Sequence, residues 1–323
     1  MGSSALILRP PRPDCSKPHS LQAMRSSLVV VVGLVLTAAN VLVYRFRPEI
    51  IQDLSLTAHD LLIQTCLRSA QSHDVAVVDI DEKSLEQFGQ WPWPRYRVAD
   101  LVDRLFEAGV SVVAFDILFA EEDGKSPDRV LRDFDQHFQS RSELAGIPDD
   151  ARDFDAYFAR SISNRNVVIG CFIQSDDLGG GAITSINDAP GFVNRFFPKG
   201  RDGTPLADGA KRLKGFHGVI YPIPKLATAA KAVGFINAAV DDDNIARRTE
   251  LFWSLGDRQF APSLSVEALR QFVGADSITI DFDATGIRGL RMRDLYIPTD
   301  PFGRMVLNYR SLSGSPPRSV RPR

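Results

Sequence analysis

The longest uninterrupted hydrophobic stretch of the chain lies near its start, from Leu28 to Tyr44. It contains no charged residue, and charge resumes only at Arg45. A run of about 17 residues is at the short end of what a helix needs to cross a bilayer. We therefore predict a single transmembrane helix over 28–44, ended by Pro48.

Two other interpretations of this stretch stay open. A buried core helix would carry a polar stripe, but the run offers only Thr37 and Asn40. A cleaved signal peptide would end in a small-x-small site. The nearest candidate, residues 36–38, has leucine at its first position.

The leader over 1–27 sets the expected orientation. Its charged residues are mostly basic: Arg9, Arg12, Lys17 and Arg25 against Asp14. Positive residues stay in the cytoplasm, so the chain after Arg47 is predicted to lie outside it.

Beyond the leader, apolar runs alternate with helical patterns. Residues 75–80 are a short apolar run, typical of a strand buried on both faces. An amphipathic helix is predicted over 96–108, with Gly109 as its C-terminal stop. A second buried strand follows over 111–115. Strand, helix and strand at this spacing predict a βαβ unit, hence parallel pairing with a right-handed crossover.

The remaining elements complete the predicted fold. In chain order we expect a helix over 49–69, a polar loop with a short exposed helix over 121–150, a helix over 154–163, a strand over 167–173, a Gly-rich surface excursion over 175–216, a hairpin of 233–240 and 246–255, a helix over 263–272, and strands over 277–281 and 305–308. The fold class is therefore α/β: a mixed, mostly parallel sheet flanked by helices, behind an N-terminal transmembrane helix. The main domain is predicted over 49–310, and 311–323 is predicted to be a disordered tail.

Composition narrows the function classes. The 323 residues carry a formal net charge of −2 and a pI of about 6.2, and no basic stripe of the kind that nucleic-acid binding needs. Three cysteines are too few for a disulfide framework. Cys66 and Cys171 are expected to be buried thiols, with a disulfide in an oxidising compartment as the alternative. The histidines, among them His73 and His217, show no metal-ligand spacing, so no metal or cofactor is expected.

Acidic residues follow the predicted strands. Asp79 and Asp81 end the first strand and Asp116 ends the second, and ligands gather at the carboxyl ends of parallel strands. Asp79 and Asp81 with Mg²⁺ would resemble a haloacid-dehalogenase-like phosphohydrolase. The match is poor, because Lys83 stands where that family has Thr or Val. The alternatives are a cation-binding edge, solvated strand ends, and a helix N-cap at Asp81.

The segment Trp91-Pro92-Trp93-Pro94-Arg95 is the most unusual motif. Its prolines fix φ and extend the residues before them, so two indoles are presented rigidly beside a helix start. Trp91, Trp93 and Arg95 are therefore candidates for a ligand wall or a partner surface. The alternative is that they pack over the sheet edge. Gly179-Gly180-Gly181 has no Gly-Lys-Ser/Thr after it and is not a phosphate loop, and no Ser/His/Asp or Cys/His set is evident.

These residues carry a family resemblance over about 54–310. VAVVDIDEKSLEQFGQWPWPR, VVAFDILFAEED, NVVIGCFI, VGFINAAVDDDNIARRTELF, APSLSVEAL and IPTDPFGRMVLNYR resemble, in order, the blocks of the type 2 CHASE domain, the cyclase/histidine-kinase-associated extracellular sensor. The resemblance implies a sensory domain in the periplasm or outside the cell. It implies flanking membrane helices and an output module such as an adenylate cyclase or histidine kinase. It supplies no catalytic residues.

The sequence departs from this pattern after VLNYR, where SLSGSPPRSVRPR follows. We expect a chain truncated before its last core strand and output module, with an open sheet edge. The leading hypothesis is a non-enzymatic sensor anchored in the inner membrane by one span. Its expected partners are the membrane, a small-molecule or protein signal, and a second copy in a homodimer. The alternatives are a membrane-anchored metal-dependent phosphohydrolase using Asp79 and Asp81, and an inert remnant of a full-length sensor.

Overall fold

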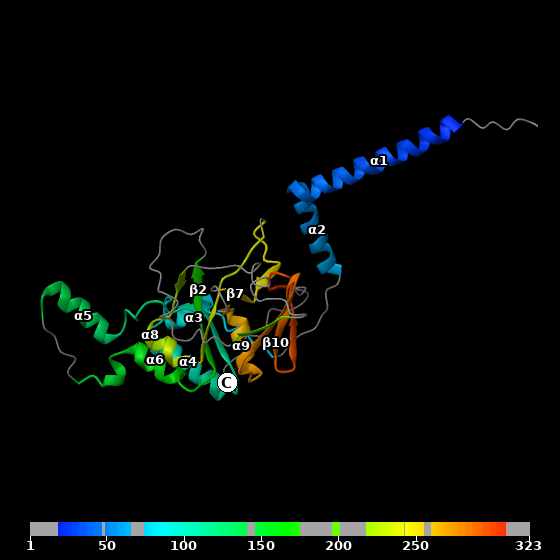
Figure 1. Cartoon of the computed structure of the whole chain (residues 1–323). Helices are drawn as coiled ribbons and strands as arrows, with labels where there is room; N and C mark the ends of the chain where they lie inside the picture. The colour runs from blue at the N-terminus through cyan, green and yellow to red at the C-terminus, as the bar shows by residue number, and fades with distance from the viewer. Residues whose placement is uncertain are drawn as a thin grey trace, which may run out of the picture. The chain divides into compact units, whose positions relative to one another are not determined.

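The structure is a computed structural model that describes residues 19–46, 49–65, 74–140, 146–174, 196–200, 218–241, 243–254 and 260–307. The chain divides into two units (Figure 1). The described part of the first unit consists of α1 and α2, and that of the second runs from Asp74 to Leu307.

Helices α1 (His19–Phe46) and α2 (Glu49–Thr65) belong to the first unit. Thr37 Oγ1 donates to Gly33 O at 2.8 Å and Asn40 Nδ2 to Leu36 O at 2.9 Å, so the polar side chains of the apolar run are satisfied within α1. Among the side chains that the structure describes, no helix offers an apolar stretch long enough to cross a membrane. The predicted span at 28–44 stays a prediction. The helix predicted over 49–69 is confirmed as far as Thr65.

The second unit is built on a mostly parallel sheet. Strand β2 (Val167–Gln174) pairs in parallel with β1 (Val113–Leu118) and β5 (Ala232–Phe235). Its last residues pair antiparallel with β4 (Gly218–Ile220). Five consecutive residues of β2 are buried, as expected for the centre of a parallel sheet. The predicted strand over 167–173 is confirmed, and the one over 111–115 begins two residues later.

Three helices cover one face of this sheet: α4 (Arg95–Glu107), α6 (Phe154–Ile162) and α8 (Pro224–Ala229). Their buried side chains share one core with alternate residues of β1 and β2, namely Val98, Ala99, Val102, Val113, Phe115, Phe119, Phe158, Ala159, Ile162, Val167, Ile169 and Leu226. The helices predicted over 96–108 and 154–163 are confirmed.

Local capping explains where several helices begin and end. Asp153 Oδ1 accepts from Ala156 N at 2.9 Å at the start of α6, and Ser263 caps α9 (Leu264–Phe272) in the same way. Gly109, just past α4, has φ of 90°, a conformation in which glycine is favoured. The predicted stop at Gly109 and the helix predicted over 263–272 are confirmed.

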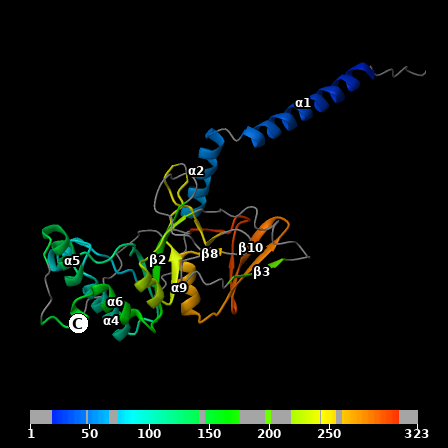
Figure 2. The same cartoon turned by 60° about the vertical axis from the view of Figure 1, so that its left-hand side comes forward.

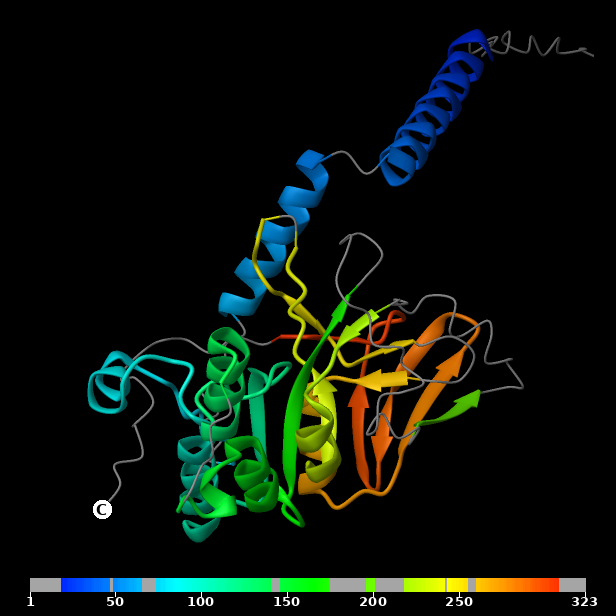
Figure 3. The same cartoon turned by 90° about the vertical axis from the view of Figure 1, so that its left-hand side faces the viewer.

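A second sheet follows in the order β11 (Leu295–Pro298), β10 (Gly286–Met292), β9 (Ile278–Asp283) and β3 (Phe196–Gly200). Only the β3–β9 pair is parallel. Helix α9 lies between β2 and β10 (Figure 2), and Figure 3 shows the orange strands of this sheet apart from the green strands of the first. Helix α9 approaches β5 so closely that a Cβ on Gly234 would lie 2.7 Å from Leu264 Cα.

The predicted hairpin of 233–240 and 246–255 is wrong. Strand β5 joins the parallel sheet, while β6 (Arg248–Glu250) pairs with β12 (Arg304–Val306) and β7 (Phe252–Ser254) with β8 (Phe260–Pro262). Strands β5 and β6 thus pair with strands distant in the chain, and β7 pairs with the next strand along it. The excursion over 175–216 lies largely outside the described residues, except that Phe196–Gly200 forms β3.

The predicted strand over 75–80 is also wrong. The segment carries no regular hydrogen-bonded structure before α3 (Glu82–Phe88), and Val75, Val77 and Val78 are 77%, 82% and 53% exposed. A strand is stabilised by its pairing partner, and β1 has β2 as its only neighbour among the described strands. The first sheet is mostly parallel, as predicted, but the predicted βαβ unit of 75–80 and 111–115 does not form, because β1 pairs with β2 instead.

Helix α5 (Pro127–Phe138) fills the polar connection after β1, as predicted, and a short 3₁₀ turn follows at Asp149–Ala151. Figures 1 and 2 both show α5 at the margin of the second unit. No residue of α5 is buried. Cys171, in β2, is a buried free thiol, as predicted.

Candidate functional site

Arg95 is the first residue of α4 and stands where the Trp-Pro-Trp-Pro turn meets the helix. Only 8% of the residue is exposed. Nine-tenths burial of a guanidinium is costly unless charged or polar partners surround it. Those partners come from the loop after β1 and from the start of α6.

Asp123, in the loop after β1, is the first partner. Its Oδ2 accepts from Arg95 N at 2.7 Å, and its Oδ1 accepts from Lys125 N at 2.9 Å. The carboxylate thus occupies the N-terminus of α4, where amide donors are unpaired and negative charge is stabilised.

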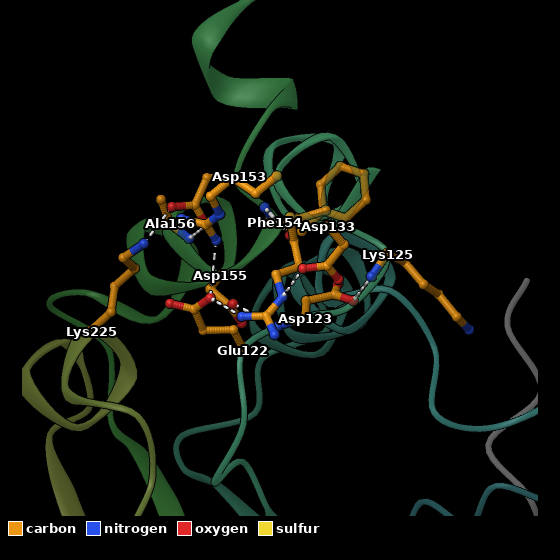
Figure 4. Close-up of polar contacts among 12 residues, drawn as sticks. Glu122, Asp123, Lys125, Asp133, Asp153, Phe154, Asp155, Ala156 and Lys225 are labelled. Atoms are coloured by element: carbon orange, nitrogen blue, oxygen red, sulfur yellow. Dashed lines mark hydrogen bonds and ion pairs between the residues drawn. The ribbon is translucent and has the colours of Figure 1, made fainter. Parts of the chain in front are cut away.

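Asp155, in the first turn of α6, is the second partner. Its Oδ2 accepts from Asp123 N at 2.8 Å, and its Oδ1 lies 3.5 Å from Arg95 Nε. Figure 4 shows Asp123 and Asp155 within one network of dashed contacts. These three residues, Arg95, Asp123 and Asp155, form what we call the Arg95 cluster. It ties α4, the loop after β1 and α6 together.

The guanidinium of Arg95 has two further contacts. It stacks over the ring of Phe119 at 4.5 Å from the centroid, and Nη2 lies 3.5 Å from Glu121 O. Arg95 Nε and Asp155 Oδ1 are buried and make no hydrogen bond within the described residues. Their attraction is a charge–charge contact, and the pair retains an unused donor and an unused acceptor.

Burial dominates the electrostatics of the cluster. It lowers the pKa of Arg95, while Asp155 and Asp123 act in the opposite direction. Burial also raises the pKa of Asp155, although the Asp123 amide and Arg95 favour the charged carboxylate. Such a pair gains little net stability, but removal of one partner leaves a buried charge alone.

A second ring of contacts surrounds the Arg95 cluster. Lys125 Nζ donates to Pro92 O at 2.6 Å, which ties the loop after β1 back to the Trp-Pro turn. Lys225, in α8, forms an ion pair with Asp153 at the start of α6. The N-termini of α4, α6 and α8 are therefore cross-linked near the carboxyl end of β1, the edge of α/β sheets where ligands usually bind.

The described contacts of the two tryptophans of the motif are packing contacts and one hydrogen bond to the backbone. Trp93 is buried and donates from Nε1 to Gly89 O at 2.6 Å. Trp91 is half-buried, packs against the core of α4, and lies edge-to-face with Trp93 at 5.9 Å between centroids. Trp91 therefore packs on the core that covers the sheet, whereas the contacts of Trp93 are with Gly89, Phe88 and Trp91.

The predicted acidic residues do not assemble into one site. Asp79 is exposed in the segment before α3, and Asp116 is exposed on β1. Asp81 is the N-cap of α3, where its Oδ1 accepts from Ser84 Oγ at 2.7 Å and Ser84 N at 2.8 Å; these hydrogen bonds lower its pKa. Across the described ranges, no group of three or more His, Cys, Asp or Glu side chains is placed to hold a metal ion.

Sequence reasoning found Arg95 but missed Asp123 and Asp155. Both aspartates lie in ordinary contexts, FAEED and DFDAYF, and the two are 32 residues apart in the chain. Asp155 does lie in the first turn of α6, two residues after its N-cap Asp153. That signal alone gives no reason to pair it with Arg95.

The structure is an α/β domain in which the buried charges of the Arg95 cluster connect α4, the loop after β1 and α6. No catalytic set is assembled in the part of the chain described. The sequence model of the CHASE2 domain matches residues 30–321. The chain therefore belongs to the CHASE2 domain family, whose members are extracellular sensory domains of signalling proteins. Comparisons with curated proteins and with solved structures found no match.

Proposed function

We propose that this chain is the input domain of a membrane-attached signal-transduction protein, and that the Arg95 cluster is the point at which a signal changes the domain. The observation that carries the proposal is the buried contact of Arg95 with Asp123 and Asp155, which joins three elements at one edge of the sheet. Family membership supplies the sensory role.

The proposed mechanism is a shift between two states of the domain. A small molecule or protein that contacts one of the joined elements would favour one arrangement of α4 against α6. The buried charges support this mechanism, because a half-broken cluster is costly and intermediate arrangements are therefore disfavoured.

Membrane attachment is the second part of the proposal. It is supported by the uncharged run from Leu28 to Tyr44 behind a basic leader. All described side chains of α1 from Leu28 to Val43 are exposed, so this apolar surface is available to lipid. We propose that α1 is the membrane anchor and that the domain after it lies outside the cytoplasm.

The test of this location is an alkaline-phosphatase fusion, since that enzyme is active only after export to an oxidising compartment. A fusion after Ala120 in the otherwise intact chain should be active, and a matched fusion after Lys17 should be inactive. The reverse pattern, or inactivity of both, would overturn the proposed topology.

A second measurement separates the sensor from the phosphohydrolase. The purified chain is incubated with p-nitrophenyl phosphate and Mg²⁺, beside an Asp79→Asn variant. The proposal expects no metal-dependent turnover in either protein. Turnover that requires Mg²⁺ and disappears in Asp79→Asn would replace the sensory function with a hydrolytic one.

A further inference from the structure

Helix α5 carries an apolar stripe that faces solvent. Val130, Phe134 and Phe138 are 52%, 49% and 62% exposed. They stand four residues apart, so they lie along one side of the helix. The rings of Phe134 and Phe138 contact each other, with 4.6 Å between centroids. We call these three residues the α5 stripe.

The polar side of α5 is the side that forms ion pairs with the loop after β1. Arg129 Nη1 and Arg132 Nη2 both reach Glu122 Oε2, at 3.0 Å and 3.1 Å. At about 100° per residue, these arginines lie well away from the stripe. Their ion pairs with the loop after β1 therefore orient α5 with its apolar side outward.

This arrangement is unusual for a helix of 12 residues. Helices shorter than about 12–15 residues are marginal in water, and an amphipathic face normally supplies their stability by packing. Helix α5 has the periodicity of a packed helix, but its apolar side covers nothing within the described residues. We propose that the α5 stripe docks into an apolar groove, rimmed by lysine or arginine, on a second protein.

Charge identifies the chemistry of the groove. Two aspartates, Asp128 and Asp135, lie on one side of the stripe beside Leu131, and Asp133, on the other side, forms an ion pair with Arg129 at 3.4 Å. Both arginines of the helix are also paired with Glu122, outside the helix. A partner that buries the stripe must meet this acidic border, and a basic rim does so with complementary charge.

The same facts disfavour a second copy of α5. Antiparallel pairing of two such helices about Phe134 would bring Asp135 of one copy near Asp135 of the other, a contact between like charges. The three stripe side chains expose roughly 300 Å² per copy, given the size of aromatic side chains. Two copies would then bury roughly 600 Å², about half of what a stable interface needs, whereas a groove also covers the flanks of the helix. An acidic border also disfavours an anionic membrane surface.

Site-specific photo-crosslinking in the producing cells tests the proposal on the whole chain. Phe134 is replaced by p-benzoylphenylalanine, and Gln136, exposed on the opposite side of α5, is replaced in a matched control. The expected result is one protein adduct from position 134 that is absent from position 136. The crosslinked peptide should map to an apolar groove bordered by lysine or arginine.

The identified protein is then purified and its affinity for the chain is measured. Phe138→Asp should weaken binding about 30-fold, as for a central interface residue. The double variant Asp128→Lys, Asp135→Lys should weaken it at least tenfold, and Gln136→Lys should leave it within twofold. Thermal unfolding of the Phe138→Asp variant should match the wild type, because α5 covers no core.

Four outcomes would overturn the proposal. They are an adduct with a second copy of the chain, an adduct with lipid, no adduct beyond that of position 136, and a captured protein whose affinity does not respond to Phe138→Asp and to the aspartate variants. None of these outcomes bears on the sensory function proposed above, which depends on the Arg95 cluster and not on α5.

Discussion

Arg95 joins three parts of the second unit through different atoms. Its amide holds Asp123, its Nε faces Asp155, and its guanidinium plane covers Phe119. A lysine at this position would lose the planar stack and the directed Nε contact. Arg95 therefore connects these parts of the domain through its backbone amide and its planar guanidinium group as well as through its charge.

Replacement of Arg95 by methionine should therefore destabilise the domain strongly. The variant leaves Asp155 buried without its cation, a loss of about 3–5 kcal/mol in the free energy of unfolding. Arg104→Met on the exposed side of α4 is the matched control, with an expected change within about 0.5 kcal/mol. Urea denaturation of both variants measures the difference; equal stabilities would show that the cluster does not hold the helices.

Asp153 and Asp155 should respond to pH with opposite signs. Burial raises the pKa of Asp155 above its unfolded value, so folding favours its protonated form. Its contribution to stability is full below an unfolded pKa of about 3.9 and is lost as the pH rises through the higher folded value. Burial also acts to raise the pKa of Asp153, but hydrogen bonds from Lys225 and the Ala156 amide outweigh it and lower the pKa. That contribution is present above about pH 3.9 and is lost on acidification.

Urea denaturation between pH 7 and about pH 2.5 of the variants Asp155→Asn and Asp153→Asn measures this difference. The stability deficit of Asp155→Asn relative to wild type should grow as the pH falls. The deficit of Asp153→Asn should be present at pH 7 and should shrink below about pH 4. Parallel pH profiles for the two variants would contradict the assigned shifts.

Helices were predicted far better than strands, for a physical reason. The start of α9 at Ser263 and the stop of α4 at Gly109 are local signals that the sequence displays directly. Strand pairing depends on partners far away in the chain. Residues 75–80 have the composition of a strand but no partner among the described strands, whereas Phe196–Gly200 gave no signal and pairs with β9.

The dependence on partners far away in the chain also explains which residues of the candidate site could be predicted from the sequence. Arg95, Trp91 and Trp93 could be singled out because their motif is continuous. Asp155 could not, because its relation to Arg95 exists only after α4 and α6 pack on β1. Asp79 and Asp116 were predicted to share an edge only because residues 75–80 were expected to be a strand of the sheet.

An asparagine continues the pairing of β2 and β5 where the strands end. Asn237 Oδ1 accepts from Ile173 N and its Nδ2 donates to Ile173 O, both at 2.8 Å, as a peptide group would. Asn237→Ala leaves both groups of Ile173 unpaired and should cost about 1–3 kcal/mol in thermal or urea unfolding. Asn237→Asp keeps the acceptor and loses the donor, so it should also destabilise; a neutral outcome for both would show that water replaces the amide.

Phe158 and Phe134 offer a contrast between two helices. Phe158, in α6, is fully buried and lies 5.8 Å from Phe115 and 5.5 Å from Phe119 between ring centroids. Phe158→Ala should cost about 3–5 kcal/mol, because it opens a cavity in the core. Phe134→Ala, on α5, should change the free energy of unfolding by less than about 0.5 kcal/mol. A large effect at Phe134 would mean that α5 packs on the domain in solution.

Across the whole chain, family membership is established by the sequence, while the structure explains what holds the domain together. The CHASE2 match covers 30–321 and includes α1 from residue 30 onward as well as the C-terminal sheet. Between the two sheets lies α9, whose buried pair Glu267 and Arg270 is joined at 2.8 Å. The second unit therefore contains two sets of buried charges, the Arg95 cluster and the Glu267–Arg270 ion pair within α9.

The exposed valines before α3 have a consequence for handling the protein. Val75, Val77 and Val78 form a β-branched, unpaired stretch of the kind that templates intermolecular aggregation. Asp74, Asp79 and Asp81 flank it on both sides, the usual placement of gatekeeper residues. Asp79, which first suggested phosphoryl chemistry, would then serve colloidal stability. Thioflavin T assays should show faster fibril growth for Asp79→Asn and slower growth for Val77→Lys than for the wild type, and unchanged kinetics in both would remove this role.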